Sequence, residues 1–285
     1  MNHKAIVAFL CITGILNFIL VSSVIAVTET FEETYEIASG SVFEIRNRDG
    51  KIRIEGWNGG QVKVRAVKES RWGGKLDNVK IQVLPGEHFS IETIHLLDNP
   101  KVSVSFDIQV PIDVKIERVI TSNGKIVLDR THGDTTIESS NGKIEIEDAV
   151  GNISASTSNG AISINRVKGF VSAETSNGAI EVEGVEGVVS LETSNGAIRA
   201  DVPAIGNNGL RVRTNNGKIE INLASDLNAD IEAKTSNSNI ELDGIEVVAR
   251  EISRSRLRGK IGEGGKKIIC KTSNGAIILG KLNGR

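Results

Sequence analysis

The sequence predicts an all-β protein, a single-stranded parallel β-solenoid (β-helix) of about nine coils. The main observation is a repeat: the hexapeptide TSNGAI occurs four times, with near copies between. The four identical copies occupy residues 157–162, 175–180, 193–198 and 272–277. Self-similarity at about 20 residues indicates a unit too short to bury its own apolar face, which gains a core only by stacking on its neighbours.

The second observation is period-two alternation between the repeated hexapeptides. Val189, Leu191 and Thr193 alternate with Ser190 and Glu192. This pattern is typical of strands with one buried face, and here it assigns the first three side chains to the core. Glycine is abundant, with 30 residues, whereas aromatic residues make up 4% of the chain, which fits many short strands joined by tight turns.

Residues 1–27 read as a signal peptide or an N-terminal membrane anchor. The start MNHK is followed by an apolar run over residues 5–27, which predicts one apolar helix. The run reaches the roughly 20 residues that span a bilayer, so cleavage after Ala26 and an uncleaved tether both stay open. In either case we expect an exported protein, periplasmic, at the cell surface or extracellular, that touches a membrane only through residues 5–27.

Residues 28–118 lack the repeat but keep strand patterning, for example in VFEIRNRDGKIRIEGW and VSVSFDIQVPIDVKIE. We expect this region to be an N-terminal β cap that continues into the solenoid. An open solenoid end would expose a sheet edge and apolar core side chains, and a cap protects both.

Residues 119–285 hold the solenoid repeats. Each coil turns at an Asn-Gly corner, where both residues tolerate left-handed backbone and stacked asparagines can hydrogen-bond along the rod. The corner pairs are Asn123 and Gly124, Asn141 and Gly142, Asn159 and Gly160, Asn177 and Gly178, Asn195 and Gly196, Asn216 and Gly217, and Asn274 and Gly275. In the coil that carries Ser238 in place of glycine, we expect Asn237 to take the left-handed conformation.

One isoleucine follows each corner by two residues, and we expect these side chains to stack into a single buried column. The nine residues are Ile126, Ile144, Ile162, Ile180, Ile198, Ile219, Ile240, Ile261 and Ile277. Because the chain ends almost at the last coil, we expect that end of the rod to be open and able to stack on a partner.

A basic stretch near the C-terminus is the candidate binding patch. It consists of Arg254, Arg256, Arg258, Lys260, Lys266 and Lys267. A solvated face is one interpretation, and contact with an anionic polymer or lipid headgroups is the other. Cys270 lies in an apolar run, so we expect a buried core thiol.

Several functions are disfavoured by the composition and by missing patterns. A net charge of −2 argues against binding of duplex nucleic acid. Neither a paired-carboxylate pattern nor a cation-binding aspartate cluster stands out, so we predict no catalytic residue, metal or cofactor. Long insertions between coils are missing, and residues 171–285 contain no aromatic residue that could stack on a sugar.

The signal segment, the strand IEGW, the approach VPIDVKIE and the serial SNGxI corners resemble the bacterial putative adhesin family of surface proteins of unknown function. The resemblance covers residues 38–285. It implies an exported β-solenoid, and it carries over no catalytic residue, because none is defined for the family.

Three hypotheses for function follow. The first is a noncatalytic exported cell-envelope or surface protein, an adhesin or scaffold whose repetitive face meets an envelope component, a polysaccharide or a protein partner. The alternatives are a polysaccharide-active β-helix enzyme and an envelope filament that assembles end to end.

Overall fold

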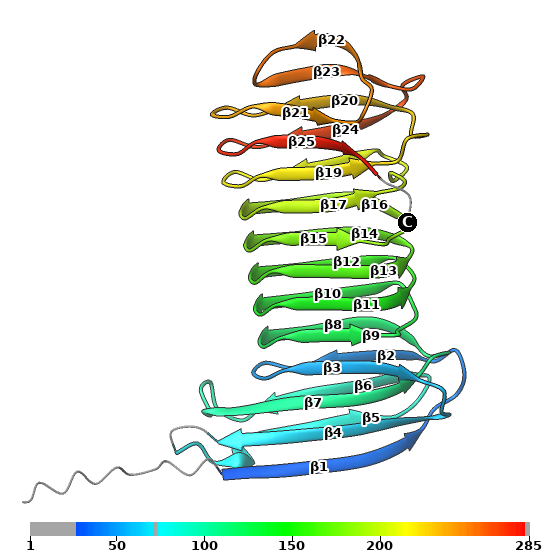
Figure 1. Ribbon diagram of the computed structural model, residues 1–285. Coiled ribbons are helices and arrows are strands. Elements are labelled where there is room, and N and C mark those ends of the chain that lie inside the picture. The colour runs from blue at the N-terminus through cyan, green and yellow to red at the C-terminus, as the bar shows by residue number, and fades with distance from the viewer. Residues whose placement is uncertain (1–26, 71–72, 283–285) are drawn as a thin grey trace, which may run out of the picture.

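The protein is a rod made of two long β-sheets, with one layer of the chain stacked on the next (Figure 1). The computed structural model describes residues 27–70 and 73–282. Apart from the short 3-10 helix η1 (Leu76–Asn78), the elements in these ranges are strands. The predicted all-β class is therefore confirmed.

The first sheet has twelve strands and the second has thirteen. In spatial order, the first sheet consists of β1 (Val27–Glu36), β4 (Gln61–Ser70), β7 (Val102–Pro111), β3 (Ile52–Trp57), β9 (Ile126–Asp129), β11 (Ile144–Val150), β13 (Ile162–Lys168), β15 (Ile180–Glu183), β17 (Ile198–Val202), β19 (Ile219–Leu223), β25 (Ile277–Lys281) and β21 (Ile240–Asp243). The second sheet, in spatial order, consists of β22 (Val248–Ile252), β23 (Arg256–Ile261), β20 (Ala229–Lys234), β24 (Lys266–Lys271), β18 (Leu210–Arg213), β16 (Gly187–Asn195), β14 (Phe170–Asn177), β12 (Ile153–Asn159), β10 (Thr135–Asn141), β8 (Lys115–Asn123), β2 (Val42–Arg46), β6 (His88–His95) and β5 (Val79–Leu84).

Each coil gives one strand to each sheet, and the two strands meet at an SNG corner. Strands β10, β12 and β14 pair in parallel in the second sheet, as β11, β13 and β15 do in the first. Equivalent residues lie opposite each other, for example Ile144 and Ile162, or Thr157 and Thr175. This register is compatible with the predicted β-solenoid, because each side chain repeats at the same place in the next coil.

The predicted isoleucine column is present with one correction. Eight of the nine isoleucines pair from coil to coil, and Ile52 of β3 extends the column beyond Ile126. Ile261 was assigned wrongly: it lies on β23 in the second sheet, opposite Ala229 of an antiparallel partner. It is buried there, but Gly259, two residues earlier, lies within β23 and is not a corner.

The last coils do not stack in chain order, so the expected open C-terminal coil is wrong. The final coil, β24 and β25, lies between the coil of β18 and β19 and the coil of β20 and β21 (Figure 1). Strands β23 and β22 then continue the second sheet beyond β20 in antiparallel pairing. The end of the rod is thus formed by residues 240–261 rather than by the C-terminus.

At the other end, residues before the first SNG corner continue both sheets. Strands β2 and β3 form a coil beside β8 and β9, and β6 and β7 form the next. Strands β4 and β1 follow in antiparallel pairing in the first sheet, and β5 does so in the second.

The predicted signal or anchor segment covers residues 1–27, of which residues 1–26 lie outside the described residues and Val27 begins strand β1. Within residues 27–70 and 73–282, the structure contains no helix long and apolar enough to cross a membrane.

Candidate functional site

The corner asparagines form a continuous hydrogen-bonded ladder along one edge of the rod. Each side-chain amide donates to the side-chain oxygen of its neighbour, at 2.6–2.9 Å. From Asp49 the order is Asn123, Asn141, Asn159, Asn177, Asn195, Asn216, Asn274 and Asn237. The amides satisfy one another, so the ladder links coils and offers few free groups to a ligand.

The corner glycines are required for a different reason from the one expected. No asparagine is among the described non-glycine residues with positive φ, and Gly124, Gly142 and Gly160 have no positive φ either. Instead, a Cβ on Gly160 would lie 2.1 Å from the carbonyl oxygen of Gly142 in the neighbouring coil, and the other six SNG glycines named above meet the same obstacle. Left-handed backbone occurs at the opposite corners, for example at Gly133 and Gly151.

The threonine of TSNG has a role that the sequence did not reveal. Its side chain points inward, and its hydroxyl donates to the carbonyl oxygen of the corner glycine in the neighbouring coil, as Thr175 does to Gly160 at 2.9 Å. The same bond is made by Thr157, Thr193, Thr214, Thr235 and Thr272. Ser139 occupies this position in its coil, and its buried hydroxyl has no hydrogen-bond partner.

The predicted basic patch lies on the second sheet near the end of the rod, where carboxylates accompany it. Glu232 pairs with Lys271 at 3.2 Å and with Arg258 at 3.8 Å, and Glu251 pairs with Arg256 at 3.3 Å. The hydrogen bond from Lys271 holds the pKa of Glu232 below its usual value. Of the other predicted residues, Arg254, Lys266 and Lys267 are exposed and Lys260 is half-buried.

A shallow groove of about 460 Å³ in this patch is lined by both signs of charge. Three cations, Arg250, Arg258 and Lys267, face three carboxylates. This balance weakens the local positive potential. Contact of the patch with an anionic polymer therefore stays a prediction.

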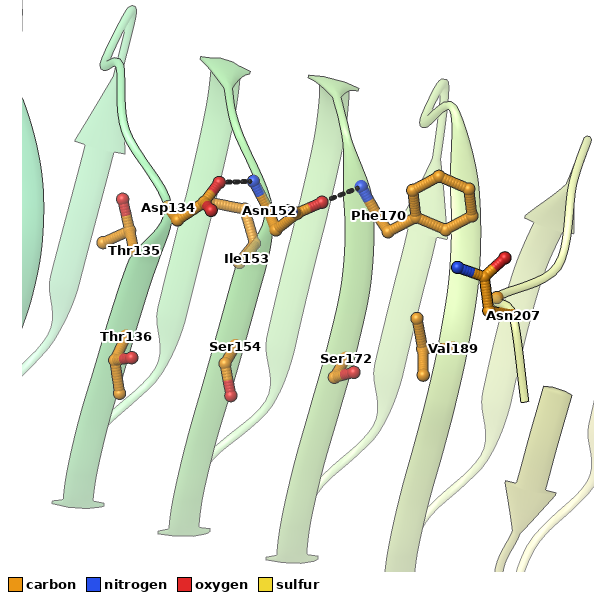
Figure 2. Close-up of a pocket in the computed structure, with 11 residues that line it drawn as sticks. Asp134, Thr135, Thr136, Asn152, Ile153, Ser154, Phe170, Ser172, Val189 and Asn207 are labelled. Atoms are coloured by element: carbon orange, nitrogen blue, oxygen red, sulfur yellow. Dashed lines mark hydrogen bonds between the residues drawn. The ribbon is translucent and has the colours of Figure 1, made fainter. Parts of the chain in front are cut away.

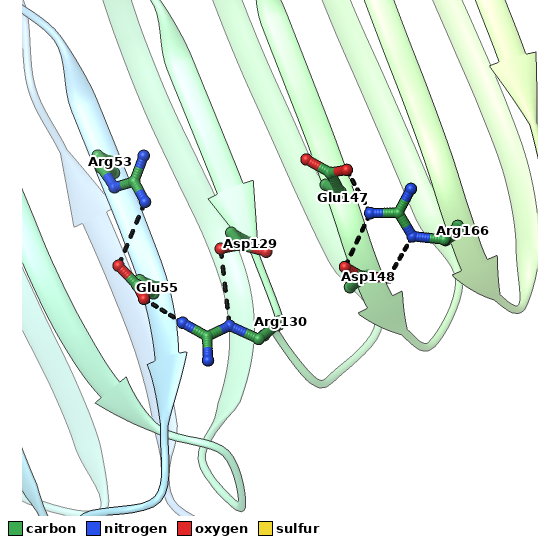
Figure 3. Close-up of polar contacts among 7 residues, drawn as sticks. All are labelled: Arg53, Glu55, Asp129, Arg130, Glu147, Asp148 and Arg166. Atoms are coloured by element: carbon green, nitrogen blue, oxygen red, sulfur yellow. Dashed lines mark hydrogen bonds and ion pairs between the residues drawn. The ribbon is translucent and has the colours of Figure 1, made fainter.

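The outer face of the first sheet carries ion pairs that link adjacent coils (Figure 3). Arg166 pairs with Asp148 at 2.6 Å and with Glu147, and this contact lowers the pKa of Asp148. Arg130 pairs with Glu55 in the same way. These groups are largely exposed and are matched by partners within the protein, so the pairs contribute little stability each and leave no charged group aimed at a ligand.

Another groove, of about 440 Å³, lies on the outer face of the second sheet (Figure 2). Its floor is a row of small hydroxyl side chains, Thr136, Ser154 and Ser172, that lie opposite one another on adjacent strands. Asp134, Asn152 and Phe170 form a second row beside it, and Val189 and Asn207 lie at the end nearest Phe170 (Figure 2). We call this feature the Phe170 groove.

The Phe170 groove is built where the repeat changes. Asp134 accepts a hydrogen bond from the backbone N–H of Asn152 at 2.7 Å, and Asn152 accepts one from the N–H of Phe170 at 3.0 Å. Phe170 thus follows Asp134 and Asn152 at intervals of 18 residues and replaces a polar side chain with an aromatic ring. Opposite it lies Gly187, where a Cβ would come within 2.4 Å of the ring, so glycine leaves room for Phe170.

A β-bulge and a loop complete the wall. The pairing of β14 with β16 shifts by one residue, so that Val171 lies opposite Val188 and Ser172 opposite Ser190. Val189 is the extra residue. It lines the groove, and the prediction that it belongs to the core is wrong: Val188 is fully buried in its place. Bulges of this kind re-aim a side chain and are frequent beside functional sites.

The adjoining loop, residues 203–209, is attached to the bulge by two backbone hydrogen bonds. The N–H of Val188 donates to Ala204 at 2.9 Å, and the N–H of Gly206 donates to Val188 at 3.1 Å. Lys266 holds Asn207 from the other side at 3.3 Å. The spacing of 21 residues between Gly196 and Gly217, compared with 18 in earlier coils, is the sequence signal for this loop.

Asp134 is the only charged residue that lines the Phe170 groove. Its side chain is exposed, as are those of Asn152 and Asn207, whereas Phe170 and Ser172 are half-buried. Within residues 27–70 and 73–282, no group of three or more His, Cys, Asp or Glu side chains is placed to hold a metal ion. The groove therefore offers hydroxyls, amides and an aromatic surface for binding.

The chain belongs to the Toastrack DUF4097 family, whose model matches residues 42–279. The family resemblance expected from the sequence is thereby confirmed. No curated protein is significantly similar to this chain.

Two solved structures are similar to it at low identity. A putative adhesin from Bacteroides fragilis has 11% identity and a TM-score of 0.48, with 88% of this chain and 97% of that chain covered. A putative cell adhesion protein from Clostridium sporogenes has 13% identity and a TM-score of 0.21, with 89% of this chain and 100% of that chain covered.

Proposed function

We propose that the protein is a noncatalytic, exported envelope or surface protein that holds an envelope component against the side of its rod. The observation that carries this proposal is the Phe170 groove, a concave binding surface built from successive coils of a rigid sheet. Stacked repeats are well suited to this role, because their elongated faces present equivalent side chains at regular intervals.

Export is supported by the first 27 residues, whose basic start and apolar run have the pattern of a signal peptide or anchor. In this proposal the rod lies outside the cytoplasmic membrane, either released or tethered through residues 5–27. Fractionation of cells that produce the full chain tests this step. Recovery of the protein in the cytoplasm would contradict it.

A binding test addresses the function itself. Full-length protein is incubated with isolated envelope material and with a panel of polysaccharides, and both bound protein and released oligosaccharide are measured. We expect binding without release. Released oligosaccharide would favour the alternative of a polysaccharide-active enzyme, and loss of binding to all envelope material would remove the proposal.

A second candidate, a filament that assembles end to end, is favoured by one observation. The end of the rod formed by residues 240–261 exposes Leu242, Val248 and Ile252, with 40%, 72% and 67% of their surfaces accessible. Strand β21 also ends the first sheet there, and sheet edges are templates for pairing with another chain. Sedimentation of the full chain at several concentrations tests this candidate, because a concentration-independent monomer would exclude it.

A further inference from the structure

We infer that the Phe170 groove binds a neutral polysaccharide strand that runs along the axis of the rod. This inference rests on the proposed binding function and names the class of ligand. Its basis is the combination of a hydroxyl row, exposed amides and an aromatic ring in one concave surface that crosses several coils.

The charge of the groove favours a neutral ligand. Its lining contains one carboxylate, Asp134, and no lysine or arginine. Lys266 stands beside the lining, but its Nζ is hydrogen-bonded to Asn207 Oδ1 at 3.3 Å. An anionic polymer would therefore meet the carboxylate of Asp134 with no cation in the lining itself to offset it, which costs binding free energy. Of the predicted basic patch, Arg258 and Lys267 line a separate groove, where carboxylates accompany them.

The hydrogen-bonding groups suit a ligand rich in hydroxyls. Thr136, Ser154 and Ser172 each offer a hydroxyl that both donates and accepts. Asn152 and Asn207 also line the groove and add amides. Because adjacent strands lie about 4.8 Å apart, these groups repeat at a regular interval along the rod, which matches an extended polymer better than a compact molecule.

The aromatic ring supplies the apolar part of such a site. Sugar rings have an apolar C–H face that packs on aromatic side chains, and aromatic surface dominates the energetics of many binding sites. Phe170 is half-buried, so part of its ring is accessible. The bulged Val189 lines the groove as well and extends that apolar surface.

An extended peptide is a poorer occupant, because it usually binds by adding a strand to a free sheet edge. The Phe170 groove lies on the face of β10, β12 and β14, whose backbone groups are paired with neighbouring strands. A peptide there would find side chains alone, and its own backbone N–H and C=O groups would lack a ladder to join.

Affinity electrophoresis of the full-length protein tests the inference. The neutral probes are hydroxyethylcellulose, galactomannan and dextran, and the anionic comparator is polygalacturonate. We expect retardation by at least one neutral probe and none by polygalacturonate. The variant Phe170→Asn, which restores the residue type of Asn152 at this repeat position, should bind at least about tenfold more weakly, because it removes the apolar contact.

Two further variants keep the test specific. Phe170→Tyr retains the ring and should retain binding, whereas Ile278→Asn makes the same kind of apolar-to-polar change on the outer face of the first sheet and should leave binding unchanged. Thermal unfolding of each variant verifies that the fold is intact. If Phe170→Asn fails to fold, Ser172→Glu, which adds a second charge to the groove, replaces it with the same expected loss.

The outcomes separate this inference from the proposed function. Equal binding of the native protein and the Phe170→Asn variant, or retardation by polygalacturonate alone, would overturn the inference. If the full chain binds isolated envelope material but none of the neutral probes, the inference is wrong and the proposed function stands. Lack of binding to any envelope material would overturn both.

Discussion

Replacement of the corner glycine Gly160 by alanine should destabilise the rod severely for so small a change. The new Cβ would lie 2.1 Å from the carbonyl oxygen of Gly142 and 2.5 Å from its carbonyl carbon. Both obstacles are backbone atoms of the neighbouring coil, so no side chain can rotate away. The two coils would have to separate by about 1 Å or more to restore ordinary contact distances.

The size of the destabilisation depends on the interactions between the two coils that this separation disturbs. Overpacking of this kind typically costs about 1–3 kcal/mol. The same interface carries the hydrogen bond from Thr157 to Gly142 at 3.1 Å and the amide bond from Asn159 to Asn141 at 2.8 Å. Each such bond contributes about 0.5–1.5 kcal/mol. We therefore expect a loss of roughly 2–6 kcal/mol in the free energy of unfolding, with the upper end reached if both bonds are lost.

Thermal and urea unfolding measure this loss, and hydrogen exchange of the amides of Ile144 and Gly160 shows whether it is local to the corner. The control is Gly60→Ala, because Gly60 has open space around its Cβ position and no positive φ, so alanine should be neutral there. If Gly160→Ala is no more destabilising than Gly60→Ala, the close-approach explanation is wrong.

A second variant separates the two explanations for the corner glycine. Asparagine tolerates left-handed backbone far better than alanine does. If backbone conformation were the reason for glycine, Gly160→Asn would therefore be milder than Gly160→Ala. Because the obstacle is contact with Gly142, we expect both variants to be equally damaging or asparagine to be worse.

Three further predictions concern single side chains. Ser139→Thr should raise the free energy of unfolding, measured by urea titration, by about 0.5–1.5 kcal/mol, because the threonine hydroxyl can donate a hydrogen bond to a corner carbonyl oxygen, as Thr157 does. An unchanged free energy would show that this carbonyl oxygen is out of reach. Cys270 is fully buried, which raises the pKa of its thiol to about 12, so a thiol reagent should label it at neutral pH only after unfolding; labelling of the native rod would contradict the packing. The pKa of Glu232 is lowered by Lys271, so its carboxylate should stabilise the fold above its ordinary pKa of 4.5, and this contribution should be lost as the pH falls through the lower pKa of the folded state. In urea titrations Glu232→Gln should therefore cost a few tenths of a kcal/mol at pH 7 and nothing at pH 2, whereas an equal cost at both pH values would assign the effect to packing.

The regular part of the rod could be predicted from the sequence because its information is local. Alternation places Ile162 and Ile164 on the buried face of β13, and the 18-residue interval places Ile180 beside Ile162. Each coil then repeats the same contacts with its neighbour. No long-range information is needed while the interval is constant.

The order of the last coils could not be predicted, because every corner carries the same chemistry. TSNGAI at residues 272–277 fits against any coil with a corner carbonyl and an isoleucine column, and the structure places it beside Gly217. Ser238 is the signal that was available. A Cβ at this corner pushes a neighbouring coil away, and that is least costly where β21 ends the first sheet and has a neighbour on one side only.

The Phe170 groove escaped prediction because it consists of small departures from the repeat. Phe170 replaces an asparagine, Gly187 removes a side chain, and Val188 and Val189 shift the alternation by one residue. None of these changes by itself indicates a groove in the sequence. Only the pairing of adjacent strands brings them together with the loop over residues 203–209.

The same departures argue for function more strongly than the residues that repeat. A side chain that recurs in every coil, such as the amide of Asn177, has a structural explanation that is complete within the rod. A bulge and a half-buried aromatic ring at one position interrupt the regular repeat of pairing and side chains from coil to coil. Local departures of this kind are expected at sites that serve binding rather than folding. By this reasoning the search for a ligand should begin at Phe170. The basic patch, in which Glu232 and Glu251 pair with Arg256 and Arg258, should come second.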